Sequence, residues 1–302
     1  MHSKKIRLNS HVWDHHRSGW KFVIKSLFDS CHSQDGIICE GIAENIFRNN
    51  IELNFPWIGF FHDTPYVHIN NLERHQKKYF LDGVFEMESW KKSINFCKGI
   101  FTFSKYTANF IEDKFPYLPI LNLKHSTIFP DIKFDFDKFS SNKKLVFVGD
   151  WLRNISSIYN IDYNNKYLLN SMQRNYSDYE YEIFKNHKPV KILNKLNDND
   201  YDNLLSESVV LSHLYESSVN NTVIECIVRN TPILVNRLPA VTEYLGEDYP
   251  LYFDSLKEAE DKINDINIIE KSHNYLCNIE KDDLKIDYFI DSFINSFIYR
   301  AL

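Results

Sequence analysis

Residues 209–253 alternate short apolar runs with helical patterns, and this regularity constrains the fold more than any other feature of the chain. A helix is predicted over 222–229, where Pro232 helps to end it, and another begins at Pro239, because proline suits the first turn of a helix. Three apolar runs of strand length frame these helices: 209–215, 233–235 and 251–253. Strands that alternate with helices form a parallel sheet covered on both faces.

The run KLVFVG at 144–149 is a further buried strand that ends on a glycine and opens this second α/β unit. The polar stretch 129–144 before it is the best linker, and 160–185 stays unassigned. The N-terminal half also alternates, with helical patterns from Trp20, over 80–96, and after Ser104, which is placed to cap its helix. Strands are expected there at 6–8, 35–41, 56–61 and 99–103.

These patterns predict an α/β fold of two Rossmann-like, doubly wound parallel-sheet domains that face a cleft. We expect an N-terminal domain at 1–140 and a second domain at 141–285. A C-terminal helix at 286–302 carries apolar residues at three- and four-residue spacing. This wide stripe packs either on its own domain or back on the N-terminal one.

Composition excludes several classes of protein. The chain has 302 residues, 43% of them apolar, which is enough for two globular cores. A net charge of −6 argues against nucleic-acid partners, and no apolar run reaches membrane-spanning length. The five cysteines are scattered, which indicates reduced thiols and a cytoplasmic location. Metal-site, P-loop, GxSxG and GxGxxG motifs are absent from the sequence, so we expect no metal and no tightly bound cofactor.

The start of the helix at 222–229 is a candidate phosphate site. The backbone N–H groups of Asn221, Thr222 and Val223 point outward from it, with Asn220 or Asn221 as the cap. Glu225 lies one turn further along, where a carboxylate can accept hydrogen bonds from a ribose diol. In the alternative, the asparagine is only a cap and Glu225 is an exposed helix residue.

Other candidates follow strand ends. Arg153 stands four residues after Gly149, where a guanidinium can bind a diphosphate; otherwise it is a surface arginine. His62 ends a strand beside Asp63, which would orient the imidazole or act as a base itself; alternatively, the pair satisfies loop backbone. In HHRSGW at 15–20, Gly19 offers a point of close approach.

The segment YESSVNNTVIECIVRNTPILVNRLPAVTEYLG at 215–246 resembles the donor-binding segment of GT-B glycosyltransferases, in particular the retaining group with paired glutamates. LVFVGDWLR, KGIFTFSKYTANFI and FFHD resemble other strands of that family, in its order and covering most of the chain.

The resemblance implies that Glu225 holds the donor ribose and the amides around Asn221 bind the diphosphate, while Arg153 offsets the leaving-group charge. It also places His62 by the sugar and matches Glu243 to a further family glutamate. Eight residues separate Glu216 from Glu225 where the family has seven, so either the loop is longer or Ser217 takes the first position. Arg153 lies further from its glycine than usual, and the lysine that normally follows is not evident. The candidate site residues are His62, Asp63, Arg153 and Glu216 for catalysis, and Gly19, Gly149, Arg153, Ser217, Asn220, Asn221, Thr222, Val223, Glu225 and Glu243 for the donor.

The sequence therefore predicts metal-independent transfer of a sugar from a UDP- or GDP-linked donor to a hydroxyl of a glycan or glycoconjugate, with retention. Surface polysaccharide or glycoprotein assembly is the setting that the resemblance implies. Peripheral membrane association is expected only if the acceptor is lipid-linked. Two alternatives stay open at this stage: a catalytically inactive GT-B-like binding or scaffold subunit, and a nucleotide-sugar epimerase.

Overall fold

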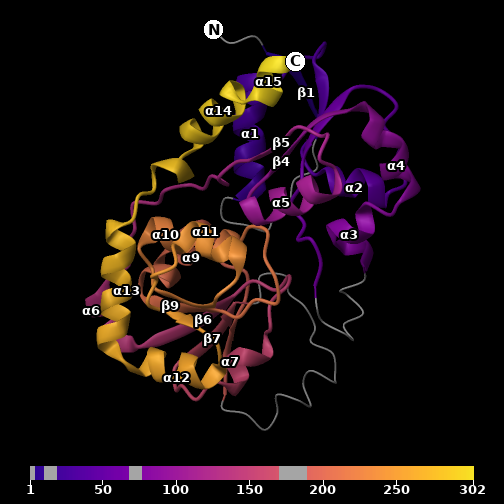
Figure 1. Ribbon diagram of the computed structural model, residues 1–302. Coiled ribbons are helices and arrows are strands. Elements are labelled where there is room, and N and C mark those ends of the chain that lie inside the picture. The colour runs from indigo at the N-terminus through magenta and orange to yellow at the C-terminus, as the bar shows by residue number, and fades with distance from the viewer. Residues whose placement is uncertain (1–3, 10–18, 68–76, 170–188) are drawn as a thin grey trace. The chain divides into compact units, whose positions relative to one another are not determined.

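A computed structural model describes residues 4–9, 19–67, 77–169 and 189–302 and divides into two compact α/β units (Figure 1). Unit 1 contains residues up to Ile128, together with Glu216–Val219 and Asp282–Leu302. Unit 2 contains Phe129–Tyr215 and Asn220–Lys281. The chain therefore passes from unit 2 into unit 1 and back within the segment 215–220.

The sheet of unit 1 is parallel, and its strands lie in sequence order. Side chains alternate between its two faces, so that Ile58 and Phe60 enter one apolar cluster while Trp57 and Phe61 enter another. The strands are β1 (Ile6–Asn9), β2 (Ile37–Glu40), β3 (Trp57–Phe60), β4 (Cys97–Thr102) and β5 (Ile120–Asn122).

The two faces of this sheet are covered differently. Helix α1 (Gly19–Cys31) packs in the cluster of Phe60, whereas the helices after β2, β3 and β4 pack in the cluster of Trp57. With strands in sequence order, crossovers of one hand leave their helices on one face, so the α1 crossover has the opposite hand from the others. The helices on the second face are α2 (Ala43–Arg48), η2 (Lys77–Tyr79), α3 (Leu81–Val84), α4 (Glu88–Ser93), η3 (Ile94–Phe96) and α5 (Lys105–Lys114).

The helical pattern predicted over 80–96 corresponds to three short helices, α3, α4 and η3, rather than to one continuous helix. Met87 is extended, with ψ 140°, and separates α3 from α4. The predicted cap of α5 is confirmed: the Ser104 hydroxyl oxygen accepts a hydrogen bond from the backbone N–H of Thr107 at 3.2 Å.

The C-terminal segment completes the α1 face of the unit 1 sheet. It comprises η4 (Asp282–Leu284), α14 (Ile286–Asn295) and α15 (Phe297–Ala301), and α14 lies beside α1 (Figure 1). The continuous helix expected here is broken at Ser296, which is extended and caps α15 through its hydroxyl group. Ile298 of α15 lies so close to Gly99 that a β-carbon there would be 2.4 Å from its side chain.

The sheet of unit 2 is parallel as well, but its strand order reverses, as a doubly wound sheet requires. The order is β11-β10-β9-β6-β7-β8, so the chain winds away from β6 in both directions and the reversal lies between β6 and β9. Its strands are β6 (Lys144–Val148), β7 (Lys166–Leu169), β8 (Lys191–Leu193), β9 (Ser208–Ser212), β10 (Ile233–Asn236) and β11 (Tyr252–Phe253).

The segment 129–144, predicted as a linker, contains a helix, α6, that Asp135 caps. The residues before it are fixed to unit 2, since the backbone N–H of Phe134 donates to the carbonyl of Arg229 and that of Asp135 to the carbonyl of Ser206. The helices of unit 2 are α6 (Phe136–Asn142), α7 (Ser156–Asn160), α9 (Asp198–Ser206), α10 (Asn221–Arg229), α11 (Pro239–Leu245), α12 (Leu256–Asn264) and α13 (Ile266–Asn278).

Candidate active site

The loop that follows β6 brings an arginine back to the strand end. Gly149 has φ +87°, a left-handed conformation that favours glycine, and a β-carbon there would lie 2.5 Å from the Arg153 Cζ. The arginine side chain therefore fills the space above Gly149. This is the position where the strand order reverses, and open α/β sheets bind their ligands outside the carboxyl ends of strands at such a point.

Backbone hydrogen bonds fix this loop to the segment after β9. Asn154 N–H donates to the carbonyl of His213 at 2.8 Å, and Tyr215 N–H donates to the carbonyl of Leu152 at 2.9 Å. Leu152 has φ +56°, which is rare for a bulky residue and stores strain that the surrounding structure must hold. Pairing with the second loop therefore sets where Arg153 stands.

The guanidinium of Arg153 lies at the N-terminus of α10. Its Nη2 donates to the side-chain oxygens of Asn220 and Thr222, both at 3.2 Å, and Nη1 donates to the carbonyl of Trp151 at 2.9 Å. Its Nε is buried and has no hydrogen-bond partner among the residues that the structure describes. Burial lowers the pKa of Arg153, while Tyr201, Asp150 and Glu225 act against that shift. An arginine stays charged under such conditions, so this helix start carries a fixed cation with an unused donor.

Asn220, rather than Asn221, caps α10, and its Oδ1 accepts from the backbone N–H of Val223 at 3.2 Å. The predicted use of the Val223 amide for a ligand is therefore wrong, because the cap occupies that donor. The amides of Asn221 and Thr222 are the first two of the helix, where backbone donors have no partner inside the helix. The N-terminus of α10 thus keeps the two amides and the positive end of the helix dipole for an anion.

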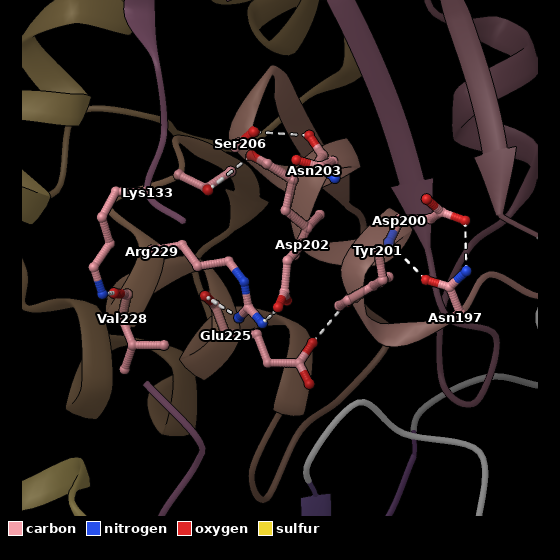
Figure 2. Close-up of polar contacts among 12 residues, drawn as sticks. Lys133, Asn197, Asp200, Tyr201, Asp202, Asn203, Ser206, Glu225, Val228 and Arg229 are labelled. Atoms are coloured by element: carbon pink, nitrogen blue, oxygen red, sulfur yellow. Dashed lines mark hydrogen bonds and ion pairs between the residues drawn. The ribbon is translucent and has the colours of Figure 1, made fainter. Parts of the chain in front are cut away.

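Glu225 is buried, with 3% of its surface exposed, so the alternative of an exposed helix residue is wrong. Its Oε2 accepts a hydrogen bond of 2.6 Å from the hydroxyl of Tyr201 on α9. The next residue of α9, Asp202, forms an ion pair with Arg229, which also donates to the carbonyl of Glu225 at 2.9 Å (Figure 2). Sequence reasoning missed Tyr201 and Asp202, which stand in no recognisable motif, and it assigned no role to Arg229, although that residue lies within the 215–246 segment.

Glu243 lies half-buried on α11, in the first turns after Pro239. Hydrogen bonds and contact distances bring together Gly149, Arg153, Asn220 and Thr222, and Glu225 is close enough for its charge to act on Arg153. None of these contacts involves Glu243.

In unit 1, His62 lies half-buried between aromatic rings just after β3. Its ring centroid lies 4.5 Å from that of Trp20 and 4.8 Å from that of Phe103. The Nε2 atom lies 2.9 Å from the carbonyl oxygen of Gly41, so this nitrogen carries the proton. Burial lowers the pKa of His62 to about 4. The imidazole is therefore neutral at pH 7 and can serve as a hydrogen-bonding group.

The expected orientation of His62 by Asp63 is wrong, since the Asp63 carboxylate forms an ion pair with Arg48. Successive side chains along an extended chain point to opposite faces, and this separates the two residues. The backbone N–H groups of His62 and Asp63 instead both donate to the carboxylate of Glu44, at 2.7 Å for Asp63. Of the alternative, in which the His62–Asp63 pair satisfies loop backbone, the structure shows only the His62 part, the bond to the Gly41 carbonyl, while the carboxylate that accepts from the loop N–H groups is that of Glu44.

Glu44 is fully buried near the start of α2, and sequence reasoning missed it. Burial raises the pKa of Glu44 to about 7, against the opposing charge of Arg48 and the two backbone donors. A second buried carboxylate, Glu40, ends β2 and accepts two hydrogen bonds from the Asn9 amide, at 3.1 and 3.0 Å. Burial raises the pKa of Glu40 to about 6. Buried carboxylates with raised pKa values are concentrated at functional sites.

The segment Glu216–Val219 belongs to unit 1, although it follows β9 of unit 2 in the chain. The Glu216 carboxylate accepts from the Tyr106 hydroxyl at 3.3 Å and from the Ser217 N–H at 3.0 Å. Ser218 donates its hydroxyl to the carbonyl of His62. The Ser217 hydroxyl is buried and has no hydrogen-bond partner within the described ranges. Glu216 and Glu225, the two glutamates of the predicted pair, thus have their contacts in different units.

Gly19 opens α1 with φ +51°, so glycine is favoured there. The preceding residues of HHRSGW, 15–18, lie outside the described residues, as do 170–185 of the unassigned stretch. Within the described ranges, no group of three or more His, Cys, Asp or Glu side chains is arranged to hold a metal ion. No helix among the residues that the structure describes is both long and apolar enough to cross a bilayer.

Solved structures of glycosyltransferases share this architecture at low sequence identity. TarM from S. aureus, solved with UDP and α-GlcNAc-glycerol among its ligands, matches 88% of this chain with a TM-score of 0.64 and 12% identity. HepE from Anabaena, solved with UDP and glucose, matches 98% of this chain with a TM-score of 0.67 and 10% identity. This chain has the GT-B glycosyltransferase fold.

The GT-B match extends over the full length of HepE, whereas this chain spans only 56% of the TarM chain. WaaG, a glycosyltransferase involved in lipopolysaccharide biosynthesis, also matches over its full length, with a TM-score of 0.59, 12% identity and 96% of this chain covered. No protein-family model and no curated protein sequence matches the chain. The resemblance to GT-B glycosyltransferases that short sequence segments indicated is therefore confirmed by the structure, without a match to any family model or curated sequence.

Proposed function

We propose that this protein is a glycosyltransferase that moves a sugar from a nucleotide-diphosphate donor to a hydroxyl group of a glycan or glycoconjugate, with retention. The donor diphosphate would lie at the N-terminus of α10, against Arg153 and the amides of Asn221 and Thr222. Glu225 would accept hydrogen bonds from the ribose.

The observation that carries this proposal is the position of Arg153. A half-buried guanidinium held over Gly149 and bonded to Asn220 and Thr222 is a preorganised site for a phosphate oxygen. It stands at the start of a helix, where the backbone also favours an anion. UDP, which TarM and HepE hold in their structures, is a ligand of this chemical class.

In the reaction, the glycosidic bond to the diphosphate breaks while the acceptor oxygen bonds to the anomeric carbon on the same face, as retention requires, and the acceptor proton passes to an oxygen of the leaving diphosphate. Negative charge then grows on the leaving diphosphate. Arg153 and the α10 amides would stabilise that charge, since fixed donors aimed at a developing charge need little reorganisation. His62, neutral and hydrogen-bonded to Gly41, would bind a sugar hydroxyl rather than transfer a proton at neutral pH.

The test is turnover of UDP- and GDP-sugars by the wild type and by Arg153→Ala. Loss of one charge-stabilising donor typically lowers kcat by about 100-fold or more, and we expect a loss of that size. Arg237→Ala is the matched control, because Arg237 is another arginine of unit 2 whose ion pair with Glu247 is exposed. Full activity in Arg153→Ala, or no hydrolysis or transfer by the wild type with any donor, would contradict the proposal.

A further inference from the structure

Tyr201 makes a contact with Glu225 that the donor site as described above does not use. The Tyr201 hydroxyl donates to Glu225 Oε2 at 2.6 Å, a short distance typical of a hydrogen bond to an ionised acceptor. Only 9% of Tyr201 and 3% of Glu225 is exposed. Burial and the neighbouring Glu225 raise the pKa of Tyr201 well above its ordinary value, so the phenol keeps its proton and remains a donor.

The contact belongs to a larger connection between α9 and α10 (Figure 2). Asp202, next to Tyr201, is ion-paired with Arg229, and the Arg229 guanidinium donates to the carbonyl of Glu225. Arg229 is buried and fully charged: burial acts to lower its pKa, but Glu225, Tyr201 and Asp202 raise it above the usual range. The α9 residues therefore hold both the backbone and the side chain of Glu225.

This arrangement gives the two carboxylate oxygens of Glu225 different roles. Hydrogen-bonded to Tyr201, Oε2 is fixed in direction, which in turn fixes the direction of Oε1. A carboxylate held in one rotamer binds a diol better than a mobile one, because less conformational freedom is lost on binding. The charge of Glu225 also supports this role, since Glu225 lies close enough to Arg153 of the proposed diphosphate site to act on the pKa of that arginine.

We propose that Tyr201 is a positioning residue for the nucleotide ribose: it orients the Glu225 carboxylate so that one oxygen receives the ribose hydroxyls. This inference rests on the proposed donor site. It adds a residue from outside the glutamate segment and predicts where specificity for ribose over deoxyribose arises.

The experiment compares the affinity of UDP with that of 2′,3′-dideoxy-UDP, by titration calorimetry, in the wild type and in Tyr201→Phe. A hydrogen bond to a charged group contributes about tenfold or more in affinity, so the wild type should bind UDP at least about tenfold more tightly than the dideoxy nucleotide. In Tyr201→Phe this ratio should fall to near one, while the affinity for the dideoxy nucleotide stays within about twofold of the wild type.

Glu225→Gln should lose the same preference, and the double variant should lose no more, because the two residues act as one unit. Tyr249→Phe is the matched control. Tyr249 is another buried tyrosine of unit 2, whose hydroxyl accepts from the backbone N–H of Ile233 at 2.8 Å, so its loss costs stability without touching Glu225. A purely structural role for Tyr201 would weaken both nucleotides equally, as in a destabilised fold.

The outcomes separate the two proposals. If the wild type binds neither UDP nor GDP, the donor site is wrong and the role of Tyr201 falls with it. If the wild type prefers UDP to its dideoxy form and Tyr201→Phe keeps the full preference, the donor site stands and the inference about Tyr201 is overturned.

Discussion

At the scale of single residues, Glu44 is the group whose environment has the clearest measurable consequence. Its carboxyl group is fully buried in unit 1 and supports the backbone of His62 and Asp63. Burial raises the pKa of Glu44 from its ordinary 4.5 to about 7. Between these values the native state holds a proton that the unfolded state has lost, so the free energy of unfolding falls as pH rises through this range.

Glu44→Gln should remove this dependence while keeping one oxygen that can accept the two backbone N–H groups. Between pH 5 and pH 7.5 the free energy of unfolding of the wild type should fall by roughly 2 kcal/mol more than that of the variant. Urea denaturation at the two pH values measures the difference. Glu52→Gln, at an exposed carboxylate of the same unit paired with Lys92, should behave like the wild type. Equal pH slopes for Glu44→Gln and the wild type would rule out a proton on Glu44.

Sequence reasoning predicted local elements but not the long-range contacts of single residues. The strand before Gly149 and the capped helix after Asn220 were correctly predicted, because apolar runs and capping residues leave local signals. The position of Arg153 was not predictable, since it depends on a left-handed leucine at 152 and on pairing with Leu214 from a later loop. Tyr201 and Glu44 were missed for the same reason: their partners are far away in sequence.

At the scale of elements, α10 joins helix capping to anion binding. Asn220 Oδ1 accepts from the Val223 N–H and also from Arg153, so one side chain both caps the helix and orients the guanidinium. Losing an N-cap of this type costs about 1 kcal/mol. Losing the acceptor for Arg153 should also loosen the cation that the donor diphosphate requires.

Asn220→Ala should therefore lose about 1 kcal/mol of stability and also bind UDP several-fold more weakly. Ser255→Ala provides the comparison, because Ser255 caps α12 of the same unit by accepting from the Glu258 N–H at 3.2 Å. Both variants should show similar losses in thermal denaturation, and only Asn220→Ala should lose UDP affinity. A parallel loss of affinity in both variants would attribute the effect to stability alone.

The elements of unit 1 show a second limit of sequence patterns. Alternating strands and helices correctly indicated a parallel sheet, but not that the strands lie in sequence order. Local periodicity indicates which residues are buried, but it does not indicate which face of the sheet the helix of a crossover covers. The opposite hand of the α1 crossover leaves the face of Phe60 to be covered by α1 together with helices from the end of the chain.

At the scale of the whole molecule, α14 and α15 provide that cover. Phe293 is fully buried, and its ring centroid lies 5.6 Å from that of Phe60 and 4.9 Å from that of Phe101. The wide apolar stripe at 286–298 was recognised in the sequence, and two destinations were left open for it. The structure packs it within unit 1.

Phe293→Ala should destabilise unit 1 by about 3 to 5 kcal/mol, the usual cost of removing a buried aromatic ring. Phe297→Ala, four residues away but 55% exposed, should change stability by less than about 0.5 kcal/mol. Urea unfolding followed by hydrogen exchange would locate the loss in the β1–β5 sheet. Similar stability in the two variants would mean that the C-terminal helices contribute little to this core.

The junction of the two chain ends has a consequence for biogenesis. Lys5, just before β1, donates hydrogen bonds to residues of α15 that are far away in sequence. Its backbone N–H donates to the Tyr299 hydroxyl, and its ammonium group donates to the carbonyls of Tyr299 and Arg300. A ribosome adding about 5 to 20 residues per second needs on the order of ten seconds or more to travel from residue 128 to the last helix. Throughout that interval only α1, of the helices α1, α14 and α15, is available to cover the apolar face that contains Phe60, so this face of the nascent sheet is a target for chaperones.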